Sequence, residues 1–381
     1  MKRKKKRKLK KKPIFFLILM IILAIFLLCK CDKKSSDKGS NNIENNNVNE
    51  KKDDSKDKKV DSKKSLSLVM VGDVLIHEAV YKDALNSDGT YDFSSMFEYI
   101  GPIIKNYDLK YCNQESIIGG KNLGISGYPN FNSPDEIGEE VVNLGFNMVG
   151  LANNHAFDKG EKAINYSVNF WKKYDNVITA GSYLSSEDRN DLKVYEKNGI
   201  RYAFLAYTTG INGNSLSKDY LVNLYDKDKV KEDIEKVNSA DVIIVAMHWG
   251  NEYTNEPTNS QREIASYLSS LGVDLIIGTH PHVVQPITYI GDTLVIYSLG
   301  NFISNQLVIG INPAIGLIVG LDITLEDDKV KFNIKEKELI FSYSDNSKNF
   351  KVVPFSKMNN DYLKNYKDVE KEYMNIVNKE L

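Results

Sequence analysis

The chain has 381 residues and a hydrophobic content of 42%, enough for one large folded domain or two ordinary ones. Ten of the first twelve residues are Lys or Arg, so residues 13–381 hold 40 Lys and Arg against 51 Asp and Glu, a net charge of −11. Binding of nucleic acid needs Lys and Arg gathered on one face to neutralise phosphates. An acidic body lacks that footprint, and we expect no nucleic-acid partner.

An apolar run from Pro13 to Cys29 follows the basic segment 1–12 and is long enough to cross a membrane with little tilt. Lysines before such a run stay in the cytoplasm, and no A-x-A cleavage pattern follows it. We predict an uncleaved, single-pass signal anchor over residues 13–31, with the rest of the chain outside the cell. The alternative is a lipoprotein acylated at Cys29 or Cys31, which the lack of small residues before either cysteine disfavours.

The next segment, residues 32–64, contains almost no large apolar residue and is predicted to be a disordered linker. Beyond it, short runs of Val, Ile and Leu alternate with helical patterns, which is typical of an α/β domain. We expect this domain over residues 65–345 and a C-terminal helical extension over 346–381. Because Cys112 is the only cysteine beyond the predicted anchor 13–31, no intramolecular disulfide is expected in the domain.

The pattern predicts seven strands and five helices before residue 310. Gly145 and Gly272 stand where a helix end favours a left-handed residue. From about residue 310 strands alternate with polar turns, which indicates an antiparallel edge or a second sheet. The strands are expected over 66–71, 109–112, 146–151, 201–207, 241–247, 273–278 and 293–299, and the helices over 93–106, 136–145, 162–174, 229–237 and 260–272.

Polar residues able to bind metal follow the carboxyl end of nearly every central strand, where the loops of an open α/β sheet share one crevice. One histidine in such a loop is usually only hydrogen-bonded, and Asp73 alone could be a helix N-cap. The position of the whole set at strand ends, which includes all five histidines, favours a metal centre. Its members are Asp73, His77, Asn113, Glu115, Asn153, Asn154, His155, Asp158, His248, His280 and His282.

Imidazole and carboxylate donors together suit Mn, Zn or Fe rather than Ca or Mg. On an extended turn, His280 and His282 would point to opposite sides, which suits two neighbouring metals better than one. A carboxylate such as Glu115 could bridge the two. We therefore predict two divalent metal ions, an arrangement that activates water and clamps a phosphoryl-like centre.

Six motifs between residues 67 and 305 resemble, in this order, those of the CapA family, the poly-γ-glutamate capsule-biosynthesis proteins of the calcineurin-like metallophosphatase superfamily. The motifs are GDVLIH, NQE, ANNHAFD, HWG, GTHPHVVQ and YSLGNFIS. The resemblance implies a four-layer fold, with two packed mixed β-sheets flanked by helices. It also implies a protein that is usually anchored in the membrane and acts outside the cell.

The resemblance assigns roles residue by residue. His155 would be catalytic, steadying the transition state or protonating the leaving group. Phosphatases have a histidine where this chain has Leu75 and an aspartate where it has Glu115. Because of these two differences, one of the two metal ions is expected to bind more weakly. The implied metal ligands are Asp73, Glu115, Asn154, His248, His280 and His282, and further candidates are His77, Asn113, Asp158, Ser298 and Asn301.

Two functions from different classes stay open. The first is a metal-dependent hydrolase acting on a phosphoester or on an amide such as the γ-glutamyl link, within capsule synthesis or export. The alternative is a non-catalytic scaffold or polymer-binding subunit that keeps only the fold, because fold does not fix function. The expected partners are the membrane, polymer-synthesis membrane proteins by resemblance, and an anionic polymer or phosphoester substrate.

Overall fold

Two β-sheets form the centre of the computed structural model, which describes residues 64–327 and 329–381. The first sheet has eight strands in the order β14-β13-β12-β1-β2-β3-β4, and β11 pairs with β1 off this path. Its strands are β1 (Ser65–Val74), β2 (Leu109–Asn113), β3 (Met148–Gly150), β4 (Ile178–Ala180), β11 (Asn301–Ile303), β12 (Ile315–Glu326), β13 (Lys329–Asp345) and β14 (Lys348–Pro354).

The second sheet has six strands in the order β5-β6-β7-β8-β10-β9. Its four central strands run parallel, and the edge strands β5 and β9 are antiparallel to their neighbours. The strands are β5 (Val194–Lys197), β6 (Ile200–Thr208), β7 (Val242–His248), β8 (Leu275–Thr279), β9 (Ile287–Ile290) and β10 (Thr293–Ile296). All seven strands expected before residue 310 are present.

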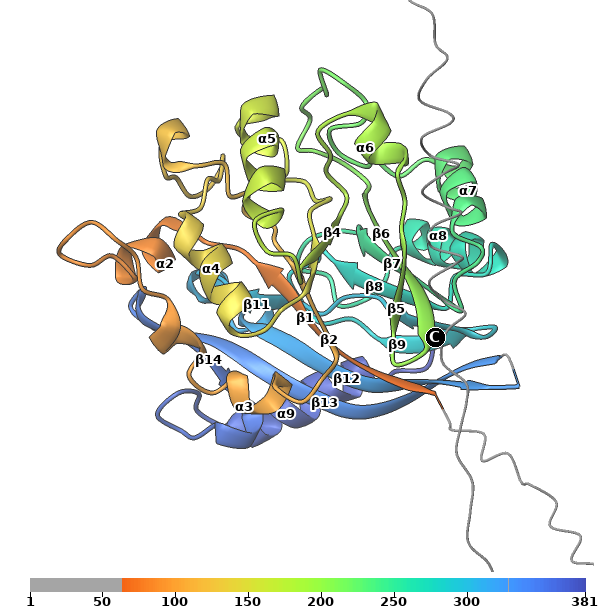
Figure 1. The fold of residues 1–381 in the computed structure, drawn as a ribbon. Coiled ribbons are helices and arrows are strands. Elements are labelled where there is room, and N and C mark those ends of the chain that lie inside the picture. Colours follow the sequence, from red (N-terminus) through yellow and green to blue (C-terminus); the bar gives the residue numbers. More distant parts are fainter. Residues whose placement is uncertain (1–63, 328) are drawn as a thin grey trace, which may run out of the picture. The chain divides into compact units, whose positions relative to one another are not determined.

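The region beyond residue 310 is antiparallel, as predicted, and it extends the first sheet. β12 pairs with β1, β13 with β12, and β14 with β13, all antiparallel. On the other side of β1, the strands β2, β3 and β4 are parallel. The first sheet is therefore mixed, and β1 is the strand at which its direction changes (Figure 1).

Three apolar cores separate the layers. The largest lies between the sheets and contains Leu68 and Met70 of β1 together with Ile244 of β7. A second core packs the other face of β1 against Ile137 and Val141 of a helix. A third packs β7 against the two helices that follow residues 226 and 258. The expectation of two packed mixed sheets flanked by helices is confirmed.

The helices begin and end where local chemistry favours it. α8 starts with a capping box between Thr258 and Gln261, and Gly145 and Gly272 follow helix ends with φ of 91° and 86°. The helices are α2 (Glu78–Asp83), α3 (Gly101–Ile104), α4 (Asp135–Asn143), α5 (Gly160–Trp171), α6 (Ser186–Asn190), α7 (Lys227–Lys236), α8 (Asn259–Ser270) and α9 (Tyr366–Val377).

Two predicted helical segments differ from the structure. Residues 93–106 form a 3₁₀ turn, Ser94–Phe97, and then the short α3, because Pro102 lacks a backbone N–H and favours a helix start. Residues 346–381 are not helical throughout, since β14 lies within them and adds a strand to the first sheet. Only α9 is the expected terminal helix, and its Val377 is buried in the core between the sheets.

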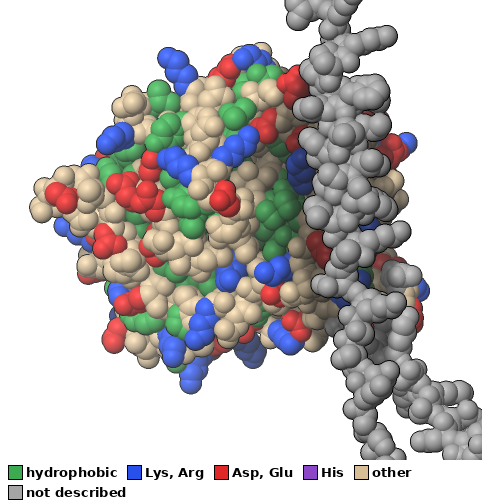
Figure 2. Space-filling model, viewed as in Figure 1, with side chains coloured by type: hydrophobic (Ala, Val, Ile, Leu, Met, Phe, Trp, Pro, Cys, Tyr) green, Lys and Arg blue, Asp and Glu red, His purple; other side chains and the backbone are tan. Residues whose placement is uncertain are grey.

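The predicted basic segment 1–12, the signal anchor 13–31 and nearly all of the linker 32–64 lie outside the described residues. Within residues 64–327 and 329–381, no helix combines the length and apolar character needed to span a membrane. On the face of this part drawn in Figure 2, Lys and Arg side chains are interspersed with Asp and Glu.

Candidate metal centre

The carboxyl ends of strands from both sheets meet at one place. Asp73 lies near the end of β1, Glu115 follows β2, and Asn154 follows β3. From the second sheet, His248 is the last residue of β7 and His280 follows β8. Parallel neighbours present their carboxyl ends at one edge, so this convergence follows from the topology.

A glycine lets a further strand approach this edge. A Cβ atom at Gly72 would lie 1.8 Å from the carbonyl oxygen of Gly300, so a side chain there would collide with the backbone. Glycine permits this contact, and the Asp73 amide donates a hydrogen bond to the Gly300 oxygen at 3.0 Å. The loop before β11 consequently lies directly beside the end of β1, next to the site.

Two sets of ligand atoms form in the described part of the chain, and Glu115 belongs to both. The first set is Glu115, His248 and His280, and the second is Asp73, Glu115 and His282. Within each set the ligand atoms lie within 4.8 Å of one another. The two histidines of the GTHPHVVQ turn thus fall into different sets, and the carboxylate expected to bridge is the shared one.

Glu115 itself indicates that a cation belongs here. Its side chain is fully buried, and neither carboxylate oxygen has a hydrogen-bond partner. The nearest imidazole nitrogens, Nε2 of His248 and Nδ1 of His282, lie 3.5 Å and 3.7 Å away. Burial raises the pKa of Glu115 to about 8, because a buried carboxylate without a partner is costly. A metal ion between these atoms removes that cost.

Three electron-rich atoms lie close to Nε2 of His248, namely Asn154 Oδ1, His280 Nδ1 and Glu115 Oε1. His248 Nε2 lies 2.8 Å from Asn154 Oδ1 and 3.1 Å from His280 Nδ1, in addition to its approach to Glu115. One ring proton cannot satisfy all of these contacts. Burial lowers the pKa of His248 to about 3 and that of His280 to about 2. Both imidazoles are therefore neutral, which is the form that binds metal.

On the other side of Glu115, His282 pairs with Asp73. Burial opposes protonation of His282, but Glu115 and Asp73 outweigh it and raise its pKa to about 9. The pKa of Asp73 is lowered, because its hydrogen bond with His282 outweighs the effect of burial. His282 Nδ1 lies 3.3 Å from Asp73 Oδ2. The proton on this imidazole supplies the positive charge that a metal would supply in its place.

The turn that carries both histidines has an unusual backbone. His280 has φ of 94° and His282 has φ of 59°, a region that residues other than glycine seldom occupy. The extended geometry expected from the sequence is therefore wrong, although the two rings do point into different ligand sets. Such strain costs on the order of 1–3 kcal/mol per residue and is concentrated at functional sites.

Neighbouring amides and hydroxyls orient the ligands, as they do at metal centres. Asn113 Nδ2 donates to Asp73 Oδ1 at 2.7 Å. His248 Nδ1 lies 3.0 Å from Thr279 Oγ1. Asn301 Oδ1 lies 3.0 Å from His282 Nδ1. Asn113 and Asn301, both predicted from the sequence, thus contact ligands without belonging to either set.

His155 lies beside the two sets and belongs to neither. Its Nδ1 is 2.7 Å from Asp158 Oδ2, and the backbone N–H of Phe131 donates to the same oxygen at 2.7 Å. Asn212, which the sequence did not single out, lies 3.2 Å from this Nδ1 and accepts a hydrogen bond from Asn154. The structure therefore brings the predicted catalytic residue next to the ligands and fixes its ring.

Two further candidates take other positions. The Nδ1 atom of His77 accepts a hydrogen bond from the Asn305 amide at 3.2 Å, and His77 is absent from both ligand sets. Ser298 is fully buried, and its hydroxyl accepts a hydrogen bond from the Gly300 amide at 3.2 Å. Ser298 thus stabilises the turn before β11, while His77 lines the cleft above the centre.

A cleft of about 300 Å³ opens over the centre and is lined by twelve residues, including His77, His155 and His282. The sequence did not identify its other walls. They come from the loop containing Tyr128 and Phe131, from Glu252 and Tyr253 after β7, and from the 3₁₀ turn Gln306–Ile309. Loops that follow strands carry these residues, so no periodic signal marks them in the sequence.

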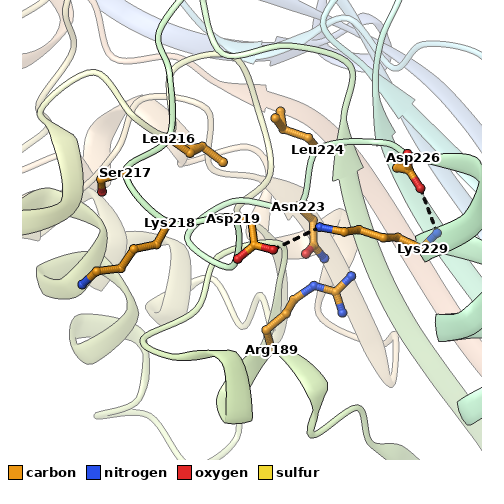
Figure 3. A pocket seen from close by; sticks show the side chains of 9 residues that line it. All are labelled: Arg189, Leu216, Ser217, Lys218, Asp219, Asn223, Leu224, Asp226 and Lys229. Carbon is orange, nitrogen blue, oxygen red and sulfur yellow. Dashed lines mark hydrogen bonds and ion pairs between the residues drawn. The ribbon is translucent and has the colours of Figure 1, made fainter.

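A second hollow of about 300 Å³ lies near Arg189, Asn223 and Lys229 (Figure 3). Its charges are paired within the protein: Lys229 lies 3.5 Å from Asp219, and Arg189 contacts Asp233 at 2.5 Å. The conspicuous cations of this hollow are therefore already neutralised, and it offers no comparable set of metal ligands.

The model of the family described as bacterial capsule synthesis protein PGA_cap matches residues 67–306. The chain belongs to the PGA_cap family. This match covers more than half of the chain and includes every predicted ligand. Membership agrees with the CapA resemblance carried by the six motifs, which is thereby confirmed.

Two relatives of this PGA_cap chain are curated. This chain is 32% identical over 266 residues to the capsule biosynthesis protein CapA of Bacillus anthracis. The match covers 64% of this chain and 61% of that protein. It is 29% identical over 253 residues to the PGA biosynthesis protein CapA of Bacillus subtilis (strain 168), covering 65% and 66%. The chain therefore aligns with somewhat less than two thirds of the length of either relative.

Solved structures resemble the PGA_cap chain more distantly. NAD nucleotidase of Haemophilus influenzae has a TM-score of 0.44 at 14% identity, covering 81% of this chain and 56% of that one. The 5′-nucleotidase of Candida albicans SC5314 has a TM-score of 0.41 at 13% identity, covering 72% and 52%.

Proposed function

We propose that this chain is a metal-dependent hydrolase of capsule polymer synthesis or export, built on a metallophosphatase-like fold. The observation that carries the proposal is the carboxylate of Glu115, which is buried without a hydrogen-bond partner and shared by two sets of ligand atoms. Divalent metals bound there would supply a water of lowered pKa and polarise the phosphoryl or carbonyl group under attack.

The donor chemistry fits two ions of Mn, Zn or Fe. One ion would be held by Asp73, Glu115 and His282. The other would be held by Glu115, His248 and His280, and Asn154 Oδ1 points towards this second set through its contact with His248. Mixed nitrogen and oxygen donors of this kind select such metals over Ca and Mg.

His155 is placed to move a proton in the reaction. Asp158 occupies its Nδ1 atom, which leaves Nε2 as the ring nitrogen available to a substrate in the cleft. His155 would donate a proton from Nε2 to the leaving group, and the contact with Asp158 at 2.7 Å orients its ring for this. Hydrolysis of a phosphoester and of an amide both require such a donor, so the site serves either bond.

The test uses the full-length protein with added Mn or Zn. We expect turnover of bis-p-nitrophenyl phosphate or of poly-γ-glutamate, and its loss in the His280→Ala and His282→Ala double variant, which removes one histidine from each ligand set. Turnover no higher in the wild type than in this variant would refute the hydrolase.

One observation favours the second function, a non-catalytic scaffold or polymer-binding subunit. Leu75 stands where the resemblance places a phosphatase histidine, and His77 does not join the ligand sets in its stead. A scaffold predicts that deletion of the gene abolishes surface polymer while the double histidine variant retains it. Loss of polymer in both strains would count against the scaffold and support catalysis.

We also propose that the protein is anchored in the cell membrane by residues 13–31, with the metal centre outside the cell and polymer-synthesis membrane proteins as partners. The apolar run and the lysines before it support this topology. Intact-mass measurement of the membrane form distinguishes the anchor, which keeps residue 1, from a lipoprotein cleaved before Cys29 or Cys31.

A further inference from the structure

The cleft above the metal centre is exposed and apolar to an unusual degree. Among the described residues, ten large hydrophobic side chains are exposed, and four of them line this one cleft. They are Tyr128, Tyr253, Val308 and Ile309, with exposed fractions of 77%, 42%, 68% and 61%. A concentration of apolar surface at a rimmed cleft marks a binding site, whereas isolated exposed side chains do not.

Aromatic contacts connect this apolar rim to the reacting centre. Tyr128 packs edge-on against Phe131 at 6.4 Å between ring centroids, and Phe131 packs edge-on against His155 at 4.6 Å. The ring centroid of Tyr253, another lining residue, lies 6.1 Å from that of His282. A group bound between these walls is therefore adjacent both to the proposed proton donor and to a metal ligand.

The rim is held in position by its own contacts. Gln306 Nε2 donates to the hydroxyl of Tyr253 at 3.2 Å, which ties the 3₁₀ turn carrying Val308 and Ile309 to the opposite loop. The Tyr253 amide also donates to the Pro281 carbonyl at 2.8 Å, within the turn between the two ligating histidines. The apolar walls are thus preorganised around the centre.

The charges of the cleft oppose a densely anionic ligand. Of its twelve lining residues, all described, none is Lys or Arg, and Glu252 is an acid. Asp73 and Glu115 add two carboxylates directly below. Bound metals would neutralise the group that reacts, but no Lys or Arg lines the cleft to pair with a second anionic group farther along it.

We infer that the substrate carries an uncharged apolar or aromatic group next to the bond that is cleaved, bound between the Tyr128 and Tyr253 walls and the Val308–Ile309 turn. This inference rests on the proposed hydrolase and narrows its substrate class. Of the two substrates proposed for the turnover test, the inference favours the aryl phosphodiester over poly-γ-glutamate, because no Lys or Arg in the cleft would pair with the carboxylates of neighbouring units.

The test measures binding, so that it does not depend on turnover. Phenylphosphonate, methylphosphonate and 4-carboxyphenylphosphonate share one head group and differ in the attached group. Calorimetry with the Mn-loaded full-length protein should show phenylphosphonate binding about tenfold tighter than methylphosphonate, since buried aromatic contacts contribute this much. The added carboxylate should weaken binding. Equal affinity for the phenyl and methyl compounds, or tighter binding of the carboxylated one, would overturn the inference.

A matched pair of variants locates the effect. Val308→Ser with Ile309→Ser should abolish the preference for phenyl and leave methylphosphonate affinity unchanged. Ile311→Ser changes a side chain that is 42% exposed in the same segment but outside the cleft lining, and it should leave both affinities unchanged. If the double serine variant and Ile311→Ser change the phenylphosphonate and methylphosphonate affinities in the same way, Val308 and Ile309 do not form the binding surface. Protein that binds Mn but none of the phosphonates contradicts the hydrolase itself as well as this inference.

Discussion

The Nδ1 atom of His155 lies 2.7 Å from Oδ2 of Asp158, and the two side chains are only 8% and 1% exposed. They stand three residues apart in the loop after β3, so one short segment supplies both the proposed proton donor and the group that orients it. Neither side chain belongs to a ligand set. Substitution here can therefore separate proton transfer from metal binding.

We predict that Asp158→Asn lowers kcat by roughly 10- to 100-fold, because a neutral amide holds the His155 ring less firmly than the carboxylate does. Metal content should stay at the wild-type value. The measurement is steady-state kinetics with metal analysis of the same preparation. A variant that loses metal in proportion to activity would show that Asp158 supports the ligands instead.

A buried ion pair outside the centre makes a stability prediction. Arg189 donates to both carboxylate oxygens of Asp233, and the two side chains are 12% and 3% exposed. Tyr207 donates to the same carboxylate at 2.8 Å. Arg189→Met should reduce the free energy of unfolding by about 3–5 kcal/mol, since it leaves a buried charge without its main partner.

The matched control for this pair is Arg201, which pairs with Asp241 but is 51% exposed. Arg201→Met should cost much less than Arg189→Met, because solvent screens an exposed pair. Urea denaturation of both variants compares them directly. Similar losses would mean that burial does not determine the strength of these pairs.

Asp274 gives a pH prediction away from the metal ligands. Burial raises its pKa to about 6, and Asp292 adds to the rise, so the folded state favours the protonated carboxyl. This contribution to stability is present in full below the unfolded pKa and is lost as the pH rises through about 6. Asp274→Asn removes the charge and keeps an oxygen for the Ile243 amide, which donates to Asp274 at 2.8 Å.

The Asp274→Asn variant should therefore be more stable than the wild type by about 1 kcal/mol at pH 8, and the two should converge near pH 4. Thermal unfolding across this range measures the difference. A difference that does not change with pH would assign the effect to the shape of the side chain and not to its charge.

The strands could be predicted because their composition identifies them. The run at 241–247 is continuously apolar, and β7 is buried at every position. The helical spacing of the segment 93–106 predicted one helix. That prediction was wrong, because Pro102 favours a new helix start within the segment. β14 was missed because its polar residues, such as Lys348 and Asn349, match the exposed end of a strand as well as they match a helix.

The clustering of the candidate ligands could be predicted because strand ends concentrate them, and the six predicted residues lie together; their binding of metal stays a prediction. What the sequence did not reveal is the shape around them. The left-handed backbone of His280 and His282 depends on tertiary contacts, such as the hydrogen bond from the His280 amide to Asp73 at 3.2 Å. Asn212 and Tyr253 lie in loops that come close to the metal centre only in the folded chain. No spacing in the sequence relates these two residues to the predicted ligands.

We propose that Glu115 joins two metal sites, and the metal content of the purified full-length protein tests this bridging role. We predict about two divalent ions per wild-type chain and fewer than one in Glu115→Gln, which keeps the volume and removes the charge. The control is Glu256→Gln, because Glu256 is exposed, and this variant should keep both ions. Gln285 is buried, so a substitution there would not be a suitable control. A wild-type chain that binds no metal, or a Glu115→Gln variant that binds as much as the wild type, would contradict the account.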